Sequence, residues 1–320
     1  MSVTISVVVP TFRRDELLSR CLHQLQRQNL DSRQYEIIVV DDGPSESTRR
    51  LVDSLQCSGG PPLRYIGAAT AHGPAAARNL GWRASRGTVI AFTDDDCLPQ
   101  SDWLLTGLRA IREADAVTGR TLVPLPERPT DYERDTSGLG QASFITANCF
   151  CRRSVLEEIG GFDERFTTAW REDSDLHFAL LEHGKRIVRV KDAVVVHPVR
   201  PAPWGVSLRL QRRGVFDPLL YRKHPQLYRQ YVPPLPRWYY VAAVTACITG
   251  LALELDRPLL NLAMAVLWLG LTARFTVQRL RRNSLASRHV AEMMLTSAAI
   301  PLLSLYWRLR GLFRHRVFYL

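Results

Sequence analysis

The sequence lacks the patterns that hold disulfide-rich or zinc-stabilised proteins together. Its six cysteines are scattered over 320 residues, with no CxxC pair and no histidine at the spacing of a zinc ligand. We therefore expect neither a disulfide framework nor a structural zinc site. The first residues lead directly into an apolar, strand-like stretch, without the charged segment and cleavage site typical of a signal peptide. A reducing, cytosolic setting is expected for the first two thirds of the chain.

Acidic residues are scarce in the last third of the chain. Residues 200–320 hold 18 Lys and Arg against 4 Asp and Glu, whereas residues 1–199 hold 24 against 27. The formal net charge of +11 therefore comes from the last third. Such an asymmetry indicates a basic interaction region. The basic residues flank apolar runs and form no continuous polar stripe, which argues against nucleic-acid binding.

No apolar run reaches the length of a membrane-spanning helix. Residues 239–253 and 259–273 form two runs of 15 residues, fewer than the roughly 20 that a spanning helix needs. Arginines on both flanks nonetheless favour a helical hairpin over 238–273 with both ends in the cytoplasm. The alternative is a hairpin buried in the protein. A further segment, 290–307, is expected to span the membrane or to lie in its interface. We predict a helical membrane-attachment region over 223–320.

Residues 5–92 alternate between short β-branched runs and stretches with helical spacing. The runs lie at 5–9, 36–40, 63–66 and 88–92. Continuous apolar runs separated by helices predict parallel strands covered on both faces, which is a doubly wound α/β sheet. Ligands of such sheets bind at the carboxyl ends of the strands. A polar, proline-containing stretch over 124–140 is expected to be a mobile loop.

Three consecutive aspartates, Asp94, Asp95 and Asp96, follow the fourth predicted strand. At the end of a buried strand such carboxylates repel one another and lose solvation unless a cation neutralises them. Hard oxygen ligands favour Mg²⁺ or Mn²⁺, which proteins often bind through one or two carboxylates together with substrate phosphates. The alternative is a solvated acidic turn that caps the next helix.

Polar or small residues also follow the three earlier strands. They are the sequences PTFRR at 10–14, DDG at 41–43 and HGP at 72–74. One such strand end is ordinary turn chemistry. Four of them at one edge of a sheet predict a binding site, because the carboxyl ends of parallel strands meet there.

Five motifs in this order resemble those of the family 2 glycosyltransferases with the GT-A fold. They are PTFRR at 10–14, VDDGP at 40–44, HGPAAARNLG at 72–81, FTDDDC at 92–97 and GGFDERF…WREDSDL at 160–176. The resemblance, which covers about residues 3–200, implies a GT-A catalytic domain, assigned here to residues 1–222, on the cytoplasmic face of the cell membrane. It implies inverting transfer of a sugar from a nucleotide-diphosphate sugar, UDP-linked in most of the family, to a glycan or lipid-linked acceptor with Mn²⁺ or Mg²⁺.

The resemblance also implies roles for single residues. The donor would be bound by Pro10, Thr11, Phe12, Asp41, Asp42, Arg78, Asp94 and Asp95. The metal would be held by Asp96, Asp94 and His197. Two of these residues have alternatives, because Arg78 also fits an ion pair on a helix surface and His197 also fits a structural histidine at a strand end.

The motif Glu172-Asp173 matches the family's ED pair, in which the aspartate is the general base. An acceptor hydroxyl that attacks the anomeric carbon must lose a proton, and Asp173 would accept it; Asp175 is taken as structural. Trp170, Glu172 and Asn148 match positions near the acceptor. Burial in the core is the alternative for Trp170, and a turn is the alternative for Asn148.

Two further functions remain open at this point. One is a membrane-bound nucleotide-sugar-binding protein without turnover, against which the intact DxD and ED motifs argue. The other is a sugar-phosphate nucleotidyltransferase, which typically has a glycine-rich loop after the first strand, whereas residues 10–14 contain no glycine. The QxxRW motif of the family's processive synthases is also missing, which favours addition of a single sugar.

Overall fold

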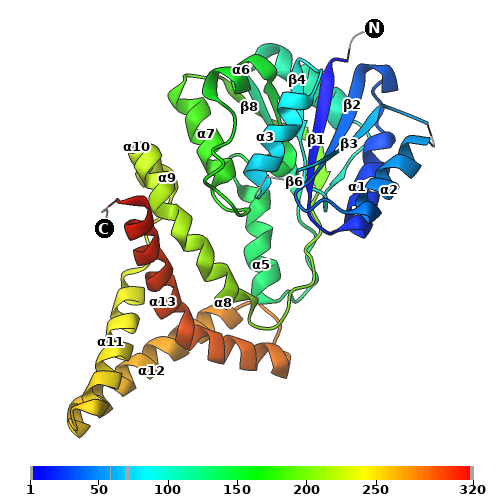
Figure 1. Cartoon of the computed structure of the whole chain (residues 1–320). Coiled ribbons are helices and arrows are strands. Elements are labelled where there is room, and N and C mark those ends of the chain that lie inside the picture. The colour runs from blue at the N-terminus through cyan, green and yellow to red at the C-terminus, as the bar shows by residue number, and fades with distance from the viewer. Residues whose placement is uncertain (1–2, 58, 69–72, 318–320) are drawn as a thin grey trace. The chain divides into compact units, whose positions relative to one another are not determined.

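A computed structural model describes residues 3–57, 59–68 and 73–317 of the protein. The chain forms two compact units, which we call the sheet unit and the helical unit (Figure 1). The sheet unit comprises Met1–Pro124 and Ser137–Val199, and the helical unit comprises Leu125–Thr136 and Arg200–Leu320. Apart from Leu125–Thr136, the helical unit thus begins at Arg200. The expected boundary at residue 222 separates regions of different function and stays a prediction.

The sheet unit is built on an eight-stranded sheet with the strand order β3-β2-β1-β4-β7-β6-β8-β5. Its strands are β1 (Ile5–Thr11), β2 (Tyr35–Asp41), β3 (Leu63–Gly67), β4 (Val89–Phe92), β5 (Leu98–Pro99), β6 (Ala116–Leu122), β7 (Cys149–Arg152) and β8 (Ile187–Val196). Strands β1 to β4 pair in parallel, as the sequence predicts. Strand β7 runs antiparallel to both β4 and β6, so the whole sheet is mixed.

Helices cover both faces of this sheet (Figure 1). Successive strand residues point to opposite faces, so Val7 and Val9 of β1 join one hydrophobic cluster and Val8 joins the other. The first cluster includes side chains of α1 (Asp15–Gln26), α2 (Glu46–Cys57) and α4 (Trp103–Ala110). The second includes side chains of α3 (Pro74–Ala84), α6 (Arg153–Ile159) and α7 (Glu172–Glu182). The two-sided covering confirms the predicted α/β architecture.

The helical unit consists of helices joined by short connections. They are α5 (Asp131–Ser137), α8 (Val206–Leu210), α9 (Asp217–Lys223), α10 (Pro225–Tyr231), α11 (Arg237–Glu254), α12 (Pro258–Leu280) and α13 (Ser287–His315). Helices α11 and α12 pack against each other, as expected of a hairpin. Helix α12 is about 34 Å long at 1.5 Å per residue, and the hydrocarbon core of a bilayer is roughly 30 Å thick.

Two described helices, α12 and α13, are long and apolar enough to cross a membrane. Both extend beyond the apolar runs seen in the sequence, because flanking polar residues continue the helices at either end. The core helix of a soluble protein meets the same criterion, so the two helices are consistent with a membrane-associated region and do not establish spanning.

The expectation of a mobile loop over 124–140 is wrong for residues 131–140, which are helical. Residues 131–137 form α5, and Thr130 and Glu133 form a capping box at its start. The carboxylate Oε2 of Glu133 accepts from the Thr130 backbone N–H at 2.6 Å, and Thr130 Oγ1 accepts from the Glu133 N–H at 3.2 Å. Asp131 pairs with Arg279 of α12, with 2.7 Å between Nη2 and Oδ2. Long-range pairing therefore orders a segment whose composition resembles a loop.

Candidate active site

The carboxyl ends of β1, β2, β4 and β8 lie at the same edge of the sheet. Strands β1, β2 and β4 are parallel. Strand β7 reverses the direction and β6 restores it, so β8, which is parallel to β6, runs in the same direction as β4. The residues that follow these strands are therefore brought together although they lie up to about 190 positions apart in the chain. This edge gathers most of the predicted site residues.

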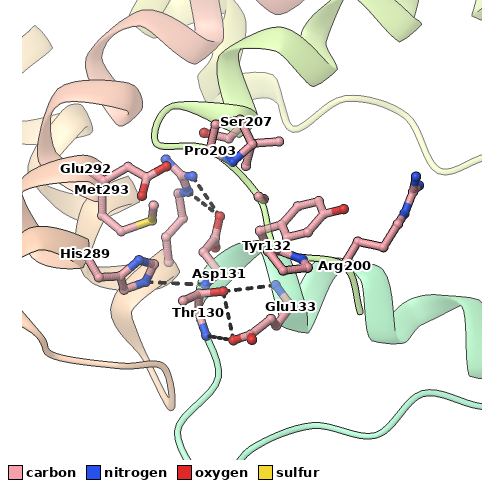
Figure 2. A pocket seen from close by; sticks show the side chains of 14 residues that line it. Thr130, Asp131, Tyr132, Glu133, Arg200, Pro203, Ser207, His289, Glu292 and Met293 are labelled. Atoms are coloured by element: carbon pink, nitrogen blue, oxygen red, sulfur yellow. Dashed lines mark hydrogen bonds and ion pairs between the residues drawn. The ribbon is translucent and has the colours of Figure 1, made fainter. Parts of the chain in front are cut away.

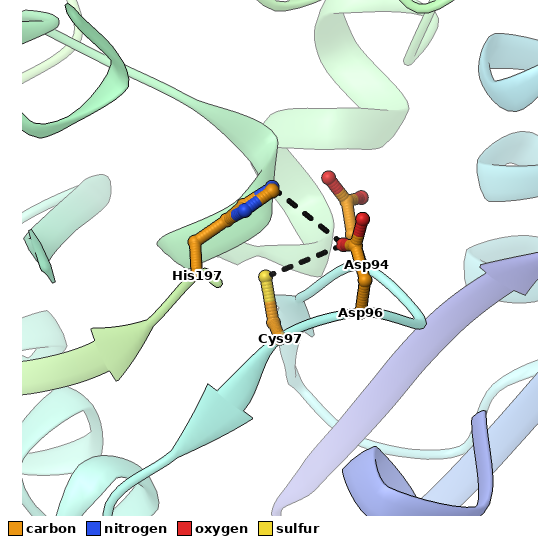
Figure 3. Close-up of side chains that lie close together, drawn as sticks. All are labelled: Asp94, Asp96, Cys97 and His197. Carbon is orange, nitrogen blue, oxygen red and sulfur yellow. Dashed lines mark hydrogen bonds and ion pairs between the residues drawn. The ribbon is translucent and has the colours of Figure 1, made fainter. Parts of the chain in front are cut away.

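Asp94, Asp96 and His197 form a cluster at this edge, together with Cys97 (Figure 3). Their candidate ligand atoms all lie within 4.8 Å of one another. The Nε2 atom of His197 is 3.6 Å from Asp96 Oδ1. The Nδ1 atom of His197 is buried and has no hydrogen-bond partner among the described residues. Two carboxylates and an imidazole fit a divalent cation such as Mn²⁺ or Mg²⁺.

Asp95 points away from this cluster. Its carboxylate accepts a hydrogen bond of 2.8 Å from Thr11 Oγ1 and pairs with Arg14 at 3.0 Å. Burial raises the pKa of Asp95, and Asp96 adds to the effect, although Arg14 opposes it. Thr11 and Asp95 thus fasten the ends of β1 and β4 to each other, and their contact with a donor stays a prediction.

Asp41 and Asp42 organise the turn that follows β2. Asp41 is fully buried and accepts from the backbone N–H groups of Gly43 and Ser45, both at 3.1 Å. Asp42 accepts from the Gly73 N–H at 2.8 Å, at the start of α3. His72, the first residue of the motif that continues into α3, lies outside the described residues.

Pro10 and Phe12 lie on either side of the end of β1. Pro10 is buried inside the strand, where it pairs in register with Val40. Phe12 is 48% exposed, and its ring lies so close to Gly43 that a Cβ atom there would come within 2.5 Å of the ring. An exposed aromatic ring next to the DDG turn is suited to stacking on a planar base.

Arg78 connects the aspartate cluster to the start of α7. Its side chain is only 2% exposed, and Nη2 donates to Asp94 Oδ1 at 2.7 Å while Nη1 donates to Glu172 Oε1 at 3.3 Å. Burial works to lower the pKa of Arg78, but the two carboxylates outweigh burial and raise it. Arg78 thus forms ion pairs inside the protein and not on the helix surface. Its contact with the nucleotide stays a prediction.

Glu172 and Asp173 occupy the first turn of α7, directly after Arg171, whose φ is +74°. Burial raises the pKa of Asp173. Burial and the neighbouring charge of Asp173 raise the pKa of Glu172 to about 7, although Arg78 opposes the shift. Glu172 is 4% exposed, whereas Asp173 is half-buried. Of the two carboxylates, Asp173 is therefore the more exposed.

The two remaining acceptor candidates differ in their surroundings. Trp170 is half-buried and packs under the Arg171 guanidinium, 4.8 Å from the ring centre. Asn148 is fully buried and accepts from Trp103 Nε1 at 2.8 Å. Its amide nitrogen donates to the carbonyls of Arg120 and Ala193 at 3.1 and 3.0 Å. Since these bonds place the Asn148 side chain in the sheet interior, we do not retain it as an acceptor contact.

Asn79 has a structural role that the sequence did not reveal. Its side-chain nitrogen donates to the Phe162 carbonyl and to Glu164 Oε1, both at 2.8 Å, and its oxygen accepts from the Phe162 N–H at 2.9 Å. Asn79 thereby fixes the loop that leads to Trp170 and Asp173. An asparagine in a helix interior, where its propensity is low, is the signal in the sequence that could have pointed to it.

Two models of known protein families match parts of the chain that include this edge of the sheet. The model described as "Glycosyl transferase family 2" matches residues 6–162, and the model described as "Glycosyl transferase family group 2" matches residues 89–309. The second match spans more than half of the chain. The protein therefore belongs to the family 2 glycosyltransferases, and it is an enzyme that transfers glycosyl groups.

Curated relatives are similar to parts of the chain. Glycosyltransferase AglE of Haloferax volcanii is 28% identical over 222 residues, which are 65% of this chain and 71% of the relative. A GalNAc(5)-diNAcBac-PP-undecaprenol beta-1,3-glucosyltransferase of Campylobacter jejuni is 32% identical over 137 residues. That alignment covers 42% of this chain and 43% of the relative, less than half of either.

Solved structures show the same fold. The mannosyltransferase PcManGT of Pyrobaculum calidifontis, in complex with GDP-Man and Mn²⁺, superimposes with a TM-score of 0.57 and 18% identity. The match covers 99% of this chain and 88% of PcManGT. S. aureus TarS 1–349 in complex with UDP-GlcNAc gives a TM-score of 0.54 at 15% identity, covering 99% of this chain and 93% of TarS 1–349. These likenesses support the GT-A type fold.

Proposed function

We propose that this enzyme transfers a sugar from a nucleotide-diphosphate sugar to an acceptor hydroxyl with inversion at the anomeric carbon. The observation that carries the proposal is the buried link from Asp94 through Arg78 to Glu172, the residue before Asp173. A candidate cation site and a candidate base are thereby held at one edge of the same sheet. Single displacement needs both a stabilised leaving group and a group that accepts the proton of the acceptor hydroxyl.

In this proposal Asp173 accepts that proton. Burial raises its pKa, which makes it a stronger base than an exposed aspartate, while the backbone N–H of Ser174 and the charge of Arg78 oppose the shift. Trp170 would contact the acceptor, whereas the buried Glu172, which pairs with Arg78, would hold Asp173 in position. An acceptor hydroxyl that loses its proton to Asp173 becomes the nucleophile, so no covalent intermediate on the enzyme is required.

Asp94, Asp96 and His197 would hold a divalent cation. When bound, such an ion stabilises the negative charge that develops on the departing diphosphate. The Nε2 atom of His197, which lies 3.6 Å from Asp96 Oδ1, supports this assignment. Imidazole suits Mn²⁺ better than Mg²⁺, and Mn²⁺ is the ion named with PcManGT.

The donor and the acceptor are proposed by chemical class. Phe12, beside the DDG turn of Asp41 and Asp42, would stack on the base of the nucleotide, which we propose to be uridine. UDP-GlcNAc is named with the TarS structure and GDP-Man with PcManGT, so both nucleotides belong in a donor screen. The Campylobacter relative is named for an undecaprenol-linked acceptor, which supports a lipid-linked glycan as acceptor here.

We further propose that the helical unit attaches the enzyme to the cytoplasmic face of the cell membrane. Helices α12 and α13 supply apolar surface of sufficient length. The 18 basic residues of positions 200–320 would lie beside anionic headgroups. The division into a catalytic region over 1–222 and a membrane-attachment region over 223–320 is part of the same proposal.

The test uses the full-length protein in detergent with UDP- and GDP-sugars, Mn²⁺ and a lipid-linked glycan acceptor. We expect release of nucleoside diphosphate together with labelled acceptor. Asp173→Asn should lose transfer by about 10²- to 10⁴-fold, the usual contribution of a general base, while it still binds donor. Asp192→Asn, on the exposed part of β8, is the matched control and should retain activity.

Each outcome separates the alternatives. Full transfer by Asp173→Asn would refute the base assignment. Donor binding without turnover in the unaltered protein would favour the binding protein over the transferase. Release of pyrophosphate from a nucleoside triphosphate and a sugar phosphate would indicate nucleotidyl transfer instead.

A further inference from the structure

A polar cavity of about 210 Å³ lies wholly within the helical unit, and none of the residues assigned to catalysis lines it (Figure 2). Four parts of the chain line it: residues 130–133 at the start of α5, residues 200–203 with 206 and 207, Arg279 of α12, and three side chains of α13. Pockets for drug-sized ligands measure roughly 300–1,000 Å³. The polar cavity is therefore too small for a nucleoside diphosphate and has the size for a ligand of a single ring.

One wall of the polar cavity is fixed by Arg279, which is 7% exposed. Its Nε and Nη2 atoms donate to Asp131 Oδ2 at 3.0 and 2.7 Å. Its Nη1 atom donates to Thr296 and Ser297 of α13 at 2.7 and 3.2 Å. The guanidinium thus joins α5, α12 and α13, and its charge is neutralised by Asp131. It offers little attraction for an anionic ligand.

Three carboxylates that line the polar cavity keep one oxygen available. Asp131 uses only Oδ2, Glu133 uses only Oε2, which accepts from Thr130, and Glu292 uses only Oε1, which accepts from the Gly205 N–H at 2.7 Å. The second oxygen of each carboxylate has no hydrogen-bond partner in the part of the chain that the structure describes. These oxygens are acceptors for ligand hydroxyl groups.

Ser207 and His289 add hydrogen-bond donors to these acceptors. The Ser207 hydroxyl is buried and has no partner among the described residues. His289 is 7% exposed, and its Nε2 atom accepts from the Asp131 backbone N–H at 3.3 Å, which leaves the proton on Nδ1. Buried polar groups without a partner are costly. A ligand that both donates and accepts hydrogen bonds would satisfy them.

The lining favours an uncharged, hydroxylated ligand over an ion. Two arginines, Arg279 and Arg200, face three carboxylates in the lining, and Arg279 is already paired with Asp131, so a phosphate is not favoured. A metal ion is not favoured either. Among the described residues, the only group of side chains placed to hold a metal ion is the cluster of Asp94, Asp96, Cys97 and His197. Vicinal hydroxyl groups match carboxylate and serine oxygens, while Met293 and Pro203 supply apolar surface for the C–H face of a ring.

We propose that the polar cavity binds one uncharged sugar ring of the acceptor glycan. The chemistry of the lining identifies a sugar ring, and the assignment of that ring to the acceptor rests on the proposed function. Two segments that line the cavity are close in the sequence to strands of the sheet unit. Arg200 follows His197 by three residues, and α5 is the next helix after β6.

The binding test uses full-length protein in detergent with EDTA and without donor. Methyl glycosides of glucose, galactose, mannose and N-acetylglucosamine are the probes, and saturation-transfer NMR is the readout. We expect at least one glycoside to bind. Ser207→Ala and Glu292→Gln should each weaken that binding at least about fivefold, the effect of one lost hydrogen bond. Glutamine at 292 can still accept from Gly205.

Matched controls are Ser304→Ala, a buried serine elsewhere on α13, and Glu254→Gln, an exposed position at the end of α11. Both should bind as the unaltered protein does. Failure of every glycoside to bind, equal binding by cavity and control variants, or displacement by UDP or GDP would each overturn the proposal. Because no donor is present, failed sugar transfer would refute the proposed function and leave this result unaffected.

A separate experiment tests whether the bound ring belongs to the acceptor. It uses an acceptor to which the enzyme transfers sugar. Ser207→Ala should raise the KM for the acceptor without changing the KM for the donor. An unchanged acceptor KM, in the presence of glycoside binding, would overturn the assignment of the ring to the acceptor.

Discussion

Arg78 occupies a position in the interior where a charge is stable only with partners on both sides. Its guanidinium contacts Asp94 and Glu172, which come from the end of β4 and the start of α7. Two elements that are far apart in the sequence therefore depend on one side chain for their relative placement. We therefore infer that Arg78 positions both carboxylates.

Removal of the Arg78 charge should strongly destabilise the protein. Arg78→Gln leaves Asp94 and Glu172 buried without their shared cation, and loss of one partner of a buried pair typically costs about 3–5 kcal/mol. The matched control is Arg83→Gln on the same helix, whose pair with Glu164 is half-exposed and should contribute less than about 1 kcal/mol. Thermal unfolding of both variants in detergent measures the difference. Equal effects would contradict the structural role of Arg78.

The protonation of Glu172 should make stability depend on pH. Its pKa in the folded protein is raised from 4.5 to about 7, so the folded state favours the protonated form. The resulting stabilisation is fully present below pH 4.5 and is lost as the pH rises through about 7. We expect the free energy of unfolding to fall over this window in EDTA. Glu172→Gln should flatten the dependence, and an unchanged slope in that variant would refute the assignment.

At the scale of elements, the start of α3 depends on a glycine that is confined by a neighbouring loop. Gly73 has a φ of +96°, and a Cβ atom there would lie 2.4 Å from the Thr167 carbonyl oxygen. The loop that contains Thr167 leads directly to Trp170 and Asp173. Any side chain at Gly73 therefore displaces the loop that leads to Trp170 and Asp173.

Gly73→Ala should lower both stability and sugar transfer. Gly60→Ala is the matched control, because Gly60 has a similar φ of +105° but no atom of the described residues within 4 Å of the point that a Cβ would occupy. Backbone strain of about 1 kcal/mol is common to both substitutions, whereas the clash is confined to Gly73. We expect a severalfold larger loss of transfer in Gly73→Ala, measured as kcat with saturating donor. Equal losses of transfer in the two variants would show that the contact between Gly73 and Thr167 does not affect catalysis.

The first four strands and their ends follow from the sequence because their apolar runs are continuous and separated by helices of ordinary length. Strand β5 does not, since it contains only 2 residues. Strand β7 does not, since its 4 residues lie outside the alternation of apolar runs and helices over residues 5–92. The antiparallel direction of β7 is set by its neighbours β4 and β6 in the sheet. Short strands of this kind are determined by tertiary pairing more than by local propensity.

The motifs predicted which residues gather at one edge of the sheet, but not the direction of each side chain. Of the three neighbouring aspartates, Asp95 turns to Thr11 and Arg14 while Asp94 and Asp96 face His197. Spacing along a turn does not determine this choice, which depends on partners from other strands.

For the molecule as a whole, the exposed apolar surface of α12 is the basis for the proposed membrane attachment. Leu262 and Val266 are 62% and 61% exposed, one helical turn apart. The double substitution Leu262→Asp with Val266→Asp should release the enzyme from membranes, because a charge in the bilayer centre costs about 2.5–3.5 kcal/mol. Flotation of the expressed protein with cell membranes in a sucrose gradient measures the release.

The corresponding double substitution to alanine keeps the surface apolar and serves as the control. It should float with the membranes. Both residues are exposed, so neither change should disturb packing in the helical unit. Continued flotation of the aspartate variant at high salt would refute attachment through α12.

The pairing of Asp131 with Arg279 has a consequence for biosynthesis. The two residues are 148 positions apart, and at 5–20 residues per second a ribosome needs roughly 7–30 s to make the intervening chain. During that time α5 lacks the partner that orders it, while the strands on either side of it can already fold. Maturation of the enzyme would then end with the emergence of its last helices, and a nascent chain released before residue 279 would carry an unsatisfied carboxylate in the segment between two finished strands.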